Sequence, residues 1–166
     1  MKLFSRAMKH LFTATRAGRA AFPERTLKEI QSAIAAGEMR HRAEVRLVVE
    51  PALDIYSVFR RMSSRERARE LFSRYRIWDT EENCGVLIYV NLADHKVEII
   101  ADRGVGRALG AEQWKSVCAN MTQGFSRGEF HDSSVAGLVR LNDLLAVGFP
   151  SDGSSLNELS NRPIVL

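Results

Sequence analysis

Acidic and amide side chains gather in the sequence beside two apolar segments, and their oxygen atoms are of the kind that binds cations. Asp79, Glu82 and Asn83 lie directly before the apolar segment 85–92, and Asp102 directly follows a second one, 97–101. Calcium and magnesium are bound in proteins by carboxylate, amide and carbonyl oxygens. These residues would form a cation site if the fold brings the ends of the two segments together.

The two apolar segments have the features of paired β-strands. A short polar turn, residues 93–96, separates GVLIYVNL from VEIIA. A connection of this length predicts a β-hairpin. In a hairpin the second strand ends beside the start of the first, so we expect Asp102 next to Asn83.

A third predicted strand brings a further carboxylate to the same end of the sheet. The valine-rich segment 43–50 ends at Pro51, and a helical segment, 55–77, connects it to residue 85. Such a strand–helix–strand unit is nearly always parallel and right-handed. The starts of segments 43–50 and 85–92 should therefore lie side by side, with Glu44 close to Asn83.

These arguments give a group of candidate metal ligands. Calcium or magnesium would be the expected ion, whereas His41 would favour zinc or manganese. Glu38 and His41 are weaker candidates than the main group, and Arg103 could hold an anion beside the metal. The main group is Glu44, Asp79, Glu82, Asn83 and Asp102.

A purely structural role explains the same residues equally well. Asp and Asn commonly cap turns at strand ends. Glu44 or Asp102 would then form a surface ion pair with Arg42 or Arg103, which contributes little to stability. The sequence leaves both explanations open.

Other reactive-looking groups point to no known catalytic arrangement. Gly104, Gly106 and Gly110 have the spacing GxGxxxG after a predicted antiparallel strand, so we expect a turn and no nucleotide cofactor. The sequence His131-Asp132-Ser133-Ser134 is more typical of a helix cap than of a hydrolase triad. His10 and His95 are expected at the surface. Cys84 and Cys118 have the surroundings of buried, reduced thiols.

The composition is that of one globular domain with a basic N-terminal arm. The chain has 166 residues and a net charge of +4, but its first nineteen residues hold five basic side chains and no acidic one. The remainder is close to neutral, so we expect no nucleic-acid partner. No apolar run approaches the roughly 20 residues of a membrane span, and no secretory signal is recognisable. The expected location is the cytoplasm.

The N-terminal arm, residues 1–22, should include an amphipathic helix. Its apolar residues recur every three or four positions, which places them on one stripe. This stripe would pack on its own domain, on a second copy in a homo-oligomer or on another protein. Alternatively, it would lie on an anionic membrane surface. The residues assigned to partner or membrane contact are Leu3, Phe4, Met8, Leu11 and Phe12.

The periodicity of the remaining chain completes the expected fold. Helices are predicted over 23–37, over 111–125 and from Asp132 or Ser133 to about Gly148. Two shorter helices are expected between the first two strands, one capped by Asp54 and the other by Ser63 or Ser64. The fold class is therefore α/β. We expect a three-layer α/β/α sandwich around a mixed sheet with a βαββ core, with one domain over 23–150 and a mobile tail over 151–166.

The core signature of the TPM-domain family resembles one segment of this chain, WDTEENCGVLIYVNLADHKVEIIADRGVG. That signature consists of an acidic segment, Asn-Asn-Gly-Val-Leu-Ile, two strands and Asp-Arg-Gly. Further similarity extends over about residues 23–150. The resemblance implies a Rossmann-like α/β/α sandwich with a divalent-cation site at one end of the sheet. Chloroplast members have been associated with phosphatase activity and photosystem repair, and this chain is similar to the short, stand-alone bacterial form. It departs from the signature at Cys84, where a second asparagine is usual.

Three functional hypotheses follow from the sequence. The first is a cation-binding interaction or regulatory module with an unidentified protein partner. The second is a metal-assisted phosphatase in which Arg103 would steady the phosphate charge, although no general base or nucleophile is evident. The third is an adaptor that contacts a membrane surface through the N-terminal helix.

Overall fold

The structure is a computed structural model that describes residues 2–13, 15–153 and 157–166. The predicted arm and tail also contain residues 1, 14 and 154–156, which lie outside the described residues. The strands are β1 (Glu44–Glu50), β2 (Gly85–Asn91), β3 (Lys96–Ala101) and β4 (Ile164–Val165). The helices are α1 (Lys2–Phe12), α2 (Thr15–Ala21), α3 (Glu24–Glu38), α4 (Ile55–Phe59), α5 (Ser64–Arg74), α6 (Arg103–Gly106), α7 (Ala111–Ser126) and α8 (Phe130–Gly148).

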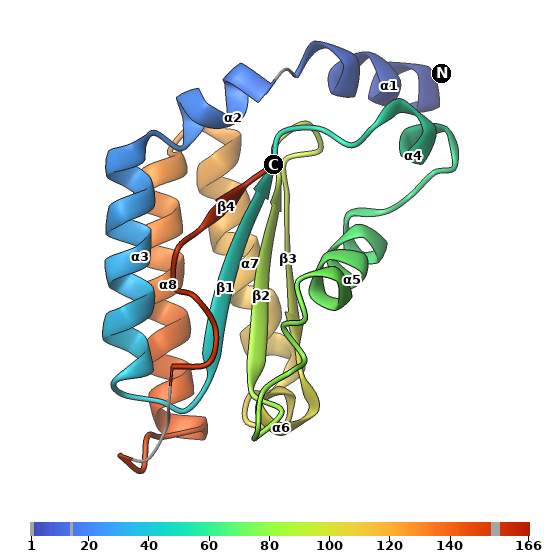
Figure 1. The fold of residues 1–166 in the computed structure, drawn as a ribbon. Coiled ribbons are helices and arrows are strands. Elements are labelled where there is room, and N and C mark those ends of the chain that lie inside the picture. Colours follow the sequence, from blue (N-terminus) through green and yellow to red (C-terminus); the bar gives the residue numbers. More distant parts are fainter. Residues whose placement is uncertain (1, 14, 154–156) are drawn as a thin grey trace.

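The four strands form one mixed sheet in the order β3-β2-β1-β4. As predicted, β1 and β2 are parallel, with Glu44 opposite Gly85, and β3 returns antiparallel to β2. The expected βαββ core is thus confirmed. Its first strand follows α3, and its crossover consists of α4 and α5 (Figure 1).

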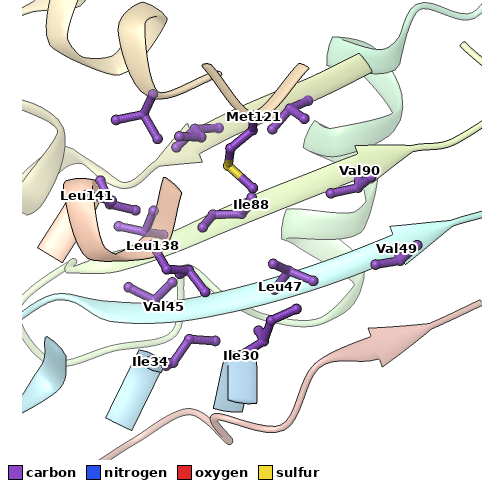
Figure 2. Packing of buried hydrophobic residues seen from close by; sticks show 14 of the residues in the cluster. Ile30, Ile34, Val45, Leu47, Val49, Ile88, Val90, Met121, Leu138 and Leu141 are labelled. Atoms are coloured by element: carbon purple, nitrogen blue, oxygen red, sulfur yellow. The ribbon is translucent and has the colours of Figure 1, made fainter. Parts of the chain in front are cut away.

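One face of the sheet packs against α3, α7 and α8, as the alternation of strand side chains requires. Val45, Leu47 and Val49 of β1 point to this face together with alternate residues of β2. Figure 2 shows these side chains between Ile30 and Ile34 of α3, Met121 of α7 and two leucines of α8. This is the larger of the two cores that flank the sheet.

The intervening strand residues point to the opposite face, which is covered mainly by α5. Val48, Leu87 and Tyr89 pack there against Ala68 and Leu71. Helices therefore lie on both faces, and the predicted α/β/α sandwich is confirmed.

The helix caps were predicted with mixed success. Asp54 accepts a hydrogen bond from Ser57 N, and Ser63 forms a capping box with Glu66, as expected. The last helix begins at Phe130, however, and not after a cap at Asp132 or Ser133. Gly128, with a φ of +80°, ends the turn after α7, and only Glu129 separates it from the start of α8.

The N-terminal arm is divided between α1 and α2, and α1 packs against α4. Leu3 and Ala7 contact a small core formed with Leu53 and Val58. His10 was predicted at the surface but is buried, and its Nδ1 accepts a hydrogen bond from Leu53 N at 2.9 Å. It lies on the same helix face as Leu3 and Ala7, which explains its burial.

The C-terminal segment contains a strand that the sequence analysis did not predict. Within the segment expected to be a mobile tail, β4 pairs with β1 in parallel and Leu166 N donates to Val49 O at 2.9 Å. The pairing is made by Ile164 and Val165, too short a run to show a strand period. Among the described helices, none has the length and apolar character that a membrane crossing would require.

Candidate functional site

The three predicted chain segments meet at the end of the sheet beside α6, which we call the α6 end: Glu44, residues 79–85 and residues 102–106. Glu44 N donates to Cys84 O at 3.1 Å, and Asp102 N donates to Gly85 O at 2.9 Å. The starts of β1 and β2 and the end of β3 therefore lie together beside α6, as predicted from strand direction (Figure 1).

The loop before β2 is fixed in close contact with α6. Asn83 has a φ of +53°, in the left-handed region that asparagine tolerates. Its carbonyl accepts a hydrogen bond from Gly104 N at 2.9 Å. A Cβ on Gly104 would lie 2.2 Å from Glu82 O, so only glycine permits this approach. The loop therefore lies directly against the start of α6.

Asp102 has one carboxylate oxygen that lacks a partner. Its Oδ1 accepts a hydrogen bond from Arg103 N at 2.7 Å and caps α6. Its Oδ2 is inaccessible to solvent and has no hydrogen-bond partner among the described residues. Such an atom is costly to bury and indicates a site where a ligand could compensate. The Arg103 side chain is exposed.

The other two acidic residues near the loop form ion pairs with arginines. Arg42 Nη1 lies 2.8 Å from Glu82 Oε2, and Arg76 Nη2 lies 2.6 Å from Asp79 Oδ2. All four side chains are at least partly exposed. Arg42 was considered as a partner of Glu44 or Asp102, but its carboxylate partner is Glu82. Asp79 is directed to the surface by its pair with Arg76.

Glu44 and Glu38 lie deeper and are covered by the C-terminal segment. Glu44 Oε2 accepts a hydrogen bond from Leu159 N at 2.9 Å, and burial raises its pKa. Glu38 Oε1 accepts one from Val45 N at 3.0 Å, while its Oε2 is buried without a partner in the described part of the chain. Burial, with a smaller contribution from the charge of Glu44, raises the pKa of Glu38 to about 7.

His41 is directed away from this group. It is fully buried, and its Nε2 lies 3.1 Å from Asn142 Oδ1 of α8. Burial lowers the pKa of its imidazole. This environment is that of a packed, neutral histidine in contact with a helix.

The convergence of backbones does not bring all predicted carboxylates together. Over residues 2–13, 15–153 and 157–166, no group of three or more His, Cys, Asp or Glu side chains is arranged to hold a metal ion. The oxygens that lie at the contact between the loop and α6 are the backbone carbonyls of Glu82 and Asn83, beside Gly104, which directly follows Asp102 and Arg103. Any cation bound there would need amide or carbonyl oxygens besides carboxylates.

The cysteines offer no activated thiolate. Burial is the main reason that the pKa of Cys84 is raised, and burial raises the pKa of Cys118 to about 11. Both are free thiols. Outside the α6 end, His131 lies 2.5 Å from Glu29 and 2.7 Å from Asp132, so its ring is occupied by two carboxylates.

Sequence reasoning missed the C-terminal contribution to this end of the molecule. Glu158 accepts a hydrogen bond from Glu81 N at 3.1 Å, and Ser160 O accepts one from Arg46. Together with Leu159, these residues lie over the starts of β1 and β2. The polar segment around them has no periodic pattern that could have indicated this position.

A comparison with protein families matches residues 18–144 to the model of the TPM domain. The chain belongs to the TPM-domain family. The TPM-domain fold seen here is also similar to a solved structure, the NMR structure of BA42 protein from the psychrophilic bacterium Bizionia argentinensis. The identity is 25%, the TM-score is 0.75, and the match covers 86% of this chain and 93% of that one. A comparison with curated proteins found no match.

Proposed function

We propose that this TPM-domain protein is a binding module that takes one divalent cation, calcium or magnesium, at the α6 end, with Asp102 as its central ligand. The observation that carries the proposal is the buried Asp102 Oδ2, which has no hydrogen-bond partner in the described part of the chain. A cation would satisfy this oxygen and would leave the hydrogen bond from Arg103 N to Oδ1 intact. Oxygen ligands of this type suit a hard cation.

Asn83 and Glu82 are the proposed further ligands. The Asn83 amide belongs to the loop that lies against α6, and the Glu82 carboxylate is held only by an exposed ion pair with Arg42. Exposed pairs contribute about 0–1 kcal/mol, so a cation can displace Arg42 at little cost. Calcium fits such a mixed and irregular ligand set better than magnesium, which requires near-octahedral geometry. Zinc or manganese has less support because His41 is bound to Asn142.

The proposed consequence of binding is a fixed loop surface for a protein partner. The loop 79–83 contacts α6 through the Asn83 carbonyl and Gly104 N. A cation shared between the loop and Asp102 would add a second connection and would neutralise part of the local negative charge. The module would then present one loop conformation to its partner.

A phosphatase activity has less support from this site. Both thiols are protonated at neutral pH, because burial raises their pKa values. Within the described residues, the one imidazole among the predicted ligands, that of His41, is buried against α8. Neither group is an activated nucleophile or a base close to Asp102. Hydrolysis of a phosphate ester that is lost in Asp102→Asn would favour the phosphatase.

The proposal is tested by thermal unfolding of the chelator-treated protein with calcium, magnesium, manganese and zinc added singly. At a concentration about 100-fold above the dissociation constant, a bound cation stabilises the folded state by about 2.7 kcal/mol. For a domain of this size, this raises the melting temperature by roughly 5–10 °C. We expect a saturable rise with calcium and a smaller one with magnesium.

Two variants make this test specific. Asp102→Asn keeps the cap oxygen but removes the charge, so it should abolish the rise. Asp143→Asn changes an exposed aspartate that pairs with Arg40 and should preserve it. No rise with any ion, or an equal rise in both variants, would refute a site at Asp102.

A further inference from the structure

Helices α1 and α4 lie together at the end of the sheet opposite α6 (Figure 1). Helix α1 is held on the domain by the polar contacts of Arg6 and His10, which include Asp94, Met62 O and Leu53 N. Arg6 Nη2 lies 2.7 Å from Asp94 Oδ2, and His10 Nε2 lies 3.1 Å from Asp94 Oδ1. One face of α1 thus packs against the domain, and these contacts fix the orientation of the face that is exposed to solvent.

The remaining surface of these helices is unusually apolar. Phe4, Leu11 and Phe12 are 72%, 66% and 74% exposed. Of the ten large hydrophobic side chains exposed in the described part of the chain, six belong to α1 and α4. We call these six the α1/α4 patch: Phe4, Leu11, Phe12, Ile55, Tyr56 and Phe59.

The structure also divides the apolar stripe predicted for the arm. Leu3 turns inward to the small core with Leu53 and Val58, whereas Phe4, Leu11 and Phe12 turn outward. Met8 is half-buried and lines a groove between α1 and the β2–β3 turn. Apolar residues therefore remain exposed after the helix has packed on its own domain.

Basic side chains predominate among the charged residues next to the patch. Lys9, Arg60 and Arg61 are exposed, and Arg60 stacks on the Tyr56 ring at 5.5 Å. Asp94 is paired with Arg6, whereas Asp54, which caps α4 through Ser57 N, is an exposed carboxylate at the start of α4. No acidic residue occurs in the sequence before Glu24.

From these observations we propose that the α1/α4 patch docks on an anionic lipid bilayer. Aromatic and aliphatic side chains enter the boundary between headgroups and acyl chains, while flanking Lys and Arg contact anionic headgroups. Long basic side chains can lay their stems along this boundary and keep their charges in the headgroup layer. The basic side chains that flank the patch, Lys9, Arg60 and Arg61, complement the negative charge of such headgroups. The combination on α1 and α4 fits a lipid surface better than a protein partner.

Vesicle co-sedimentation of the full chain tests the proposal. The vesicles contain phosphatidylcholine alone or phosphatidylcholine with phosphatidylserine, each at low and at high salt. We expect binding to the anionic vesicles only, weakened by salt because headgroup attraction is screened. Reversing one of the three basic charges, in Lys9→Glu, should lower the partition coefficient at least about fivefold.

Matched apolar substitutions connect binding to the patch. Phe12→Ser removes an exposed aromatic ring and should lower the partition coefficient about tenfold without changing the melting temperature. Val147→Ser changes an apolar residue of α8 that is 85% exposed, and it should leave the partition coefficient unchanged.

Other outcomes would overturn the proposal. One such outcome is no binding to anionic vesicles, and another is equal binding to neutral ones. A third is an equal fall of the partition coefficient in Phe12→Ser and Val147→Ser. Analytical ultracentrifugation tests whether a second copy of the chain covers the patch instead of a bilayer. If the chain is a dimer that Phe12→Ser dissociates, and vesicles are not bound, the patch is an interface between copies and the lipid proposal is wrong.

Discussion

Glu38 should make the protein less stable as the pH rises, because its carboxyl group is buried beside Glu44. The pKa of Glu38 is raised from 4.5 to about 7 in the folded protein. Between these values the folded state holds a proton that the unfolded state has released. The contribution of Glu38 to stability is therefore complete below about pH 4.5 and is lost as the pH rises through about 7.

The size of this effect follows from the two pKa values. At about 1.4 kcal/mol for each pH unit, the range from 4.5 to about 7 corresponds to at most about 3.5 kcal/mol. Glu38 retains some solvent access, which reduces the expected loss to about 2 kcal/mol. Glu38→Gln keeps an oxygen to accept the hydrogen bond from Val45 N but carries no charge. It should exceed the original protein in stability by about 2 kcal/mol at pH 8 and by much less at pH 5.

Urea unfolding at a series of pH values measures this difference. The comparison between variant and original protein is necessary because His41 acts in the opposite direction. Burial lowers the pKa of His41, so its contribution is lost as the pH falls below about 6.5. Glu112→Gln, an exposed glutamate bound to Lys115, is the control and should follow the original profile. Parallel profiles for Glu38→Gln and the original protein would refute the assignment of the pH dependence to Glu38.

Two further substitutions test contacts that position the ends of the sheet. Asp94→Ala removes the acceptor shared by Arg6 and His10. It should lower the free energy of unfolding in urea by about 2 kcal/mol and speed hydrogen exchange in α1. Unchanged exchange in α1 would show that other contacts hold this helix. Gly85→Ala would place a Cβ 1.8 Å from Ile77 O, a backbone atom, and should cost more than about 3 kcal/mol or prevent folding, measured by soluble yield and urea unfolding. Gly106→Ala, with its nearest contact at 3.7 Å, is the control and should behave normally.

The central sheet could be predicted from the sequence because its signals are local. Segment 85–92 is apolar apart from Asn91, and the turn at 93–96 fixes the antiparallel return. The crossover before Gly85 then makes β1 parallel to β2. These rules were sufficient to place Glu44, Asn83 and Asp102 at one end of the sheet.

The side-chain arrangement at the same end could not be predicted, because it depends on partners distant in the sequence. Glu82 pairs with Arg42, forty positions earlier, and Glu44 binds the backbone of Leu159. Strand direction places a residue at an end of the sheet, but it does not decide which neighbour its side chain contacts. The predicted ligand group therefore separates into ion pairs, a covered carboxylate and Asp102, whose Oδ2 alone has no partner among the described residues.

The two proposed surfaces lie at opposite ends of β1 and can act independently. Glu44 begins this strand near Asp102, and Glu50 ends it shortly before α4. Seven residues of strand span about 20 Å, which exceeds the screening length in physiological salt. A protein that docks through α1 and α4 would therefore hold the α6 end away from the bilayer, open to cations and to a partner. For the same reason, Asp102→Asn should leave vesicle binding intact, and Phe12→Ser should leave the calcium-dependent rise in melting temperature intact.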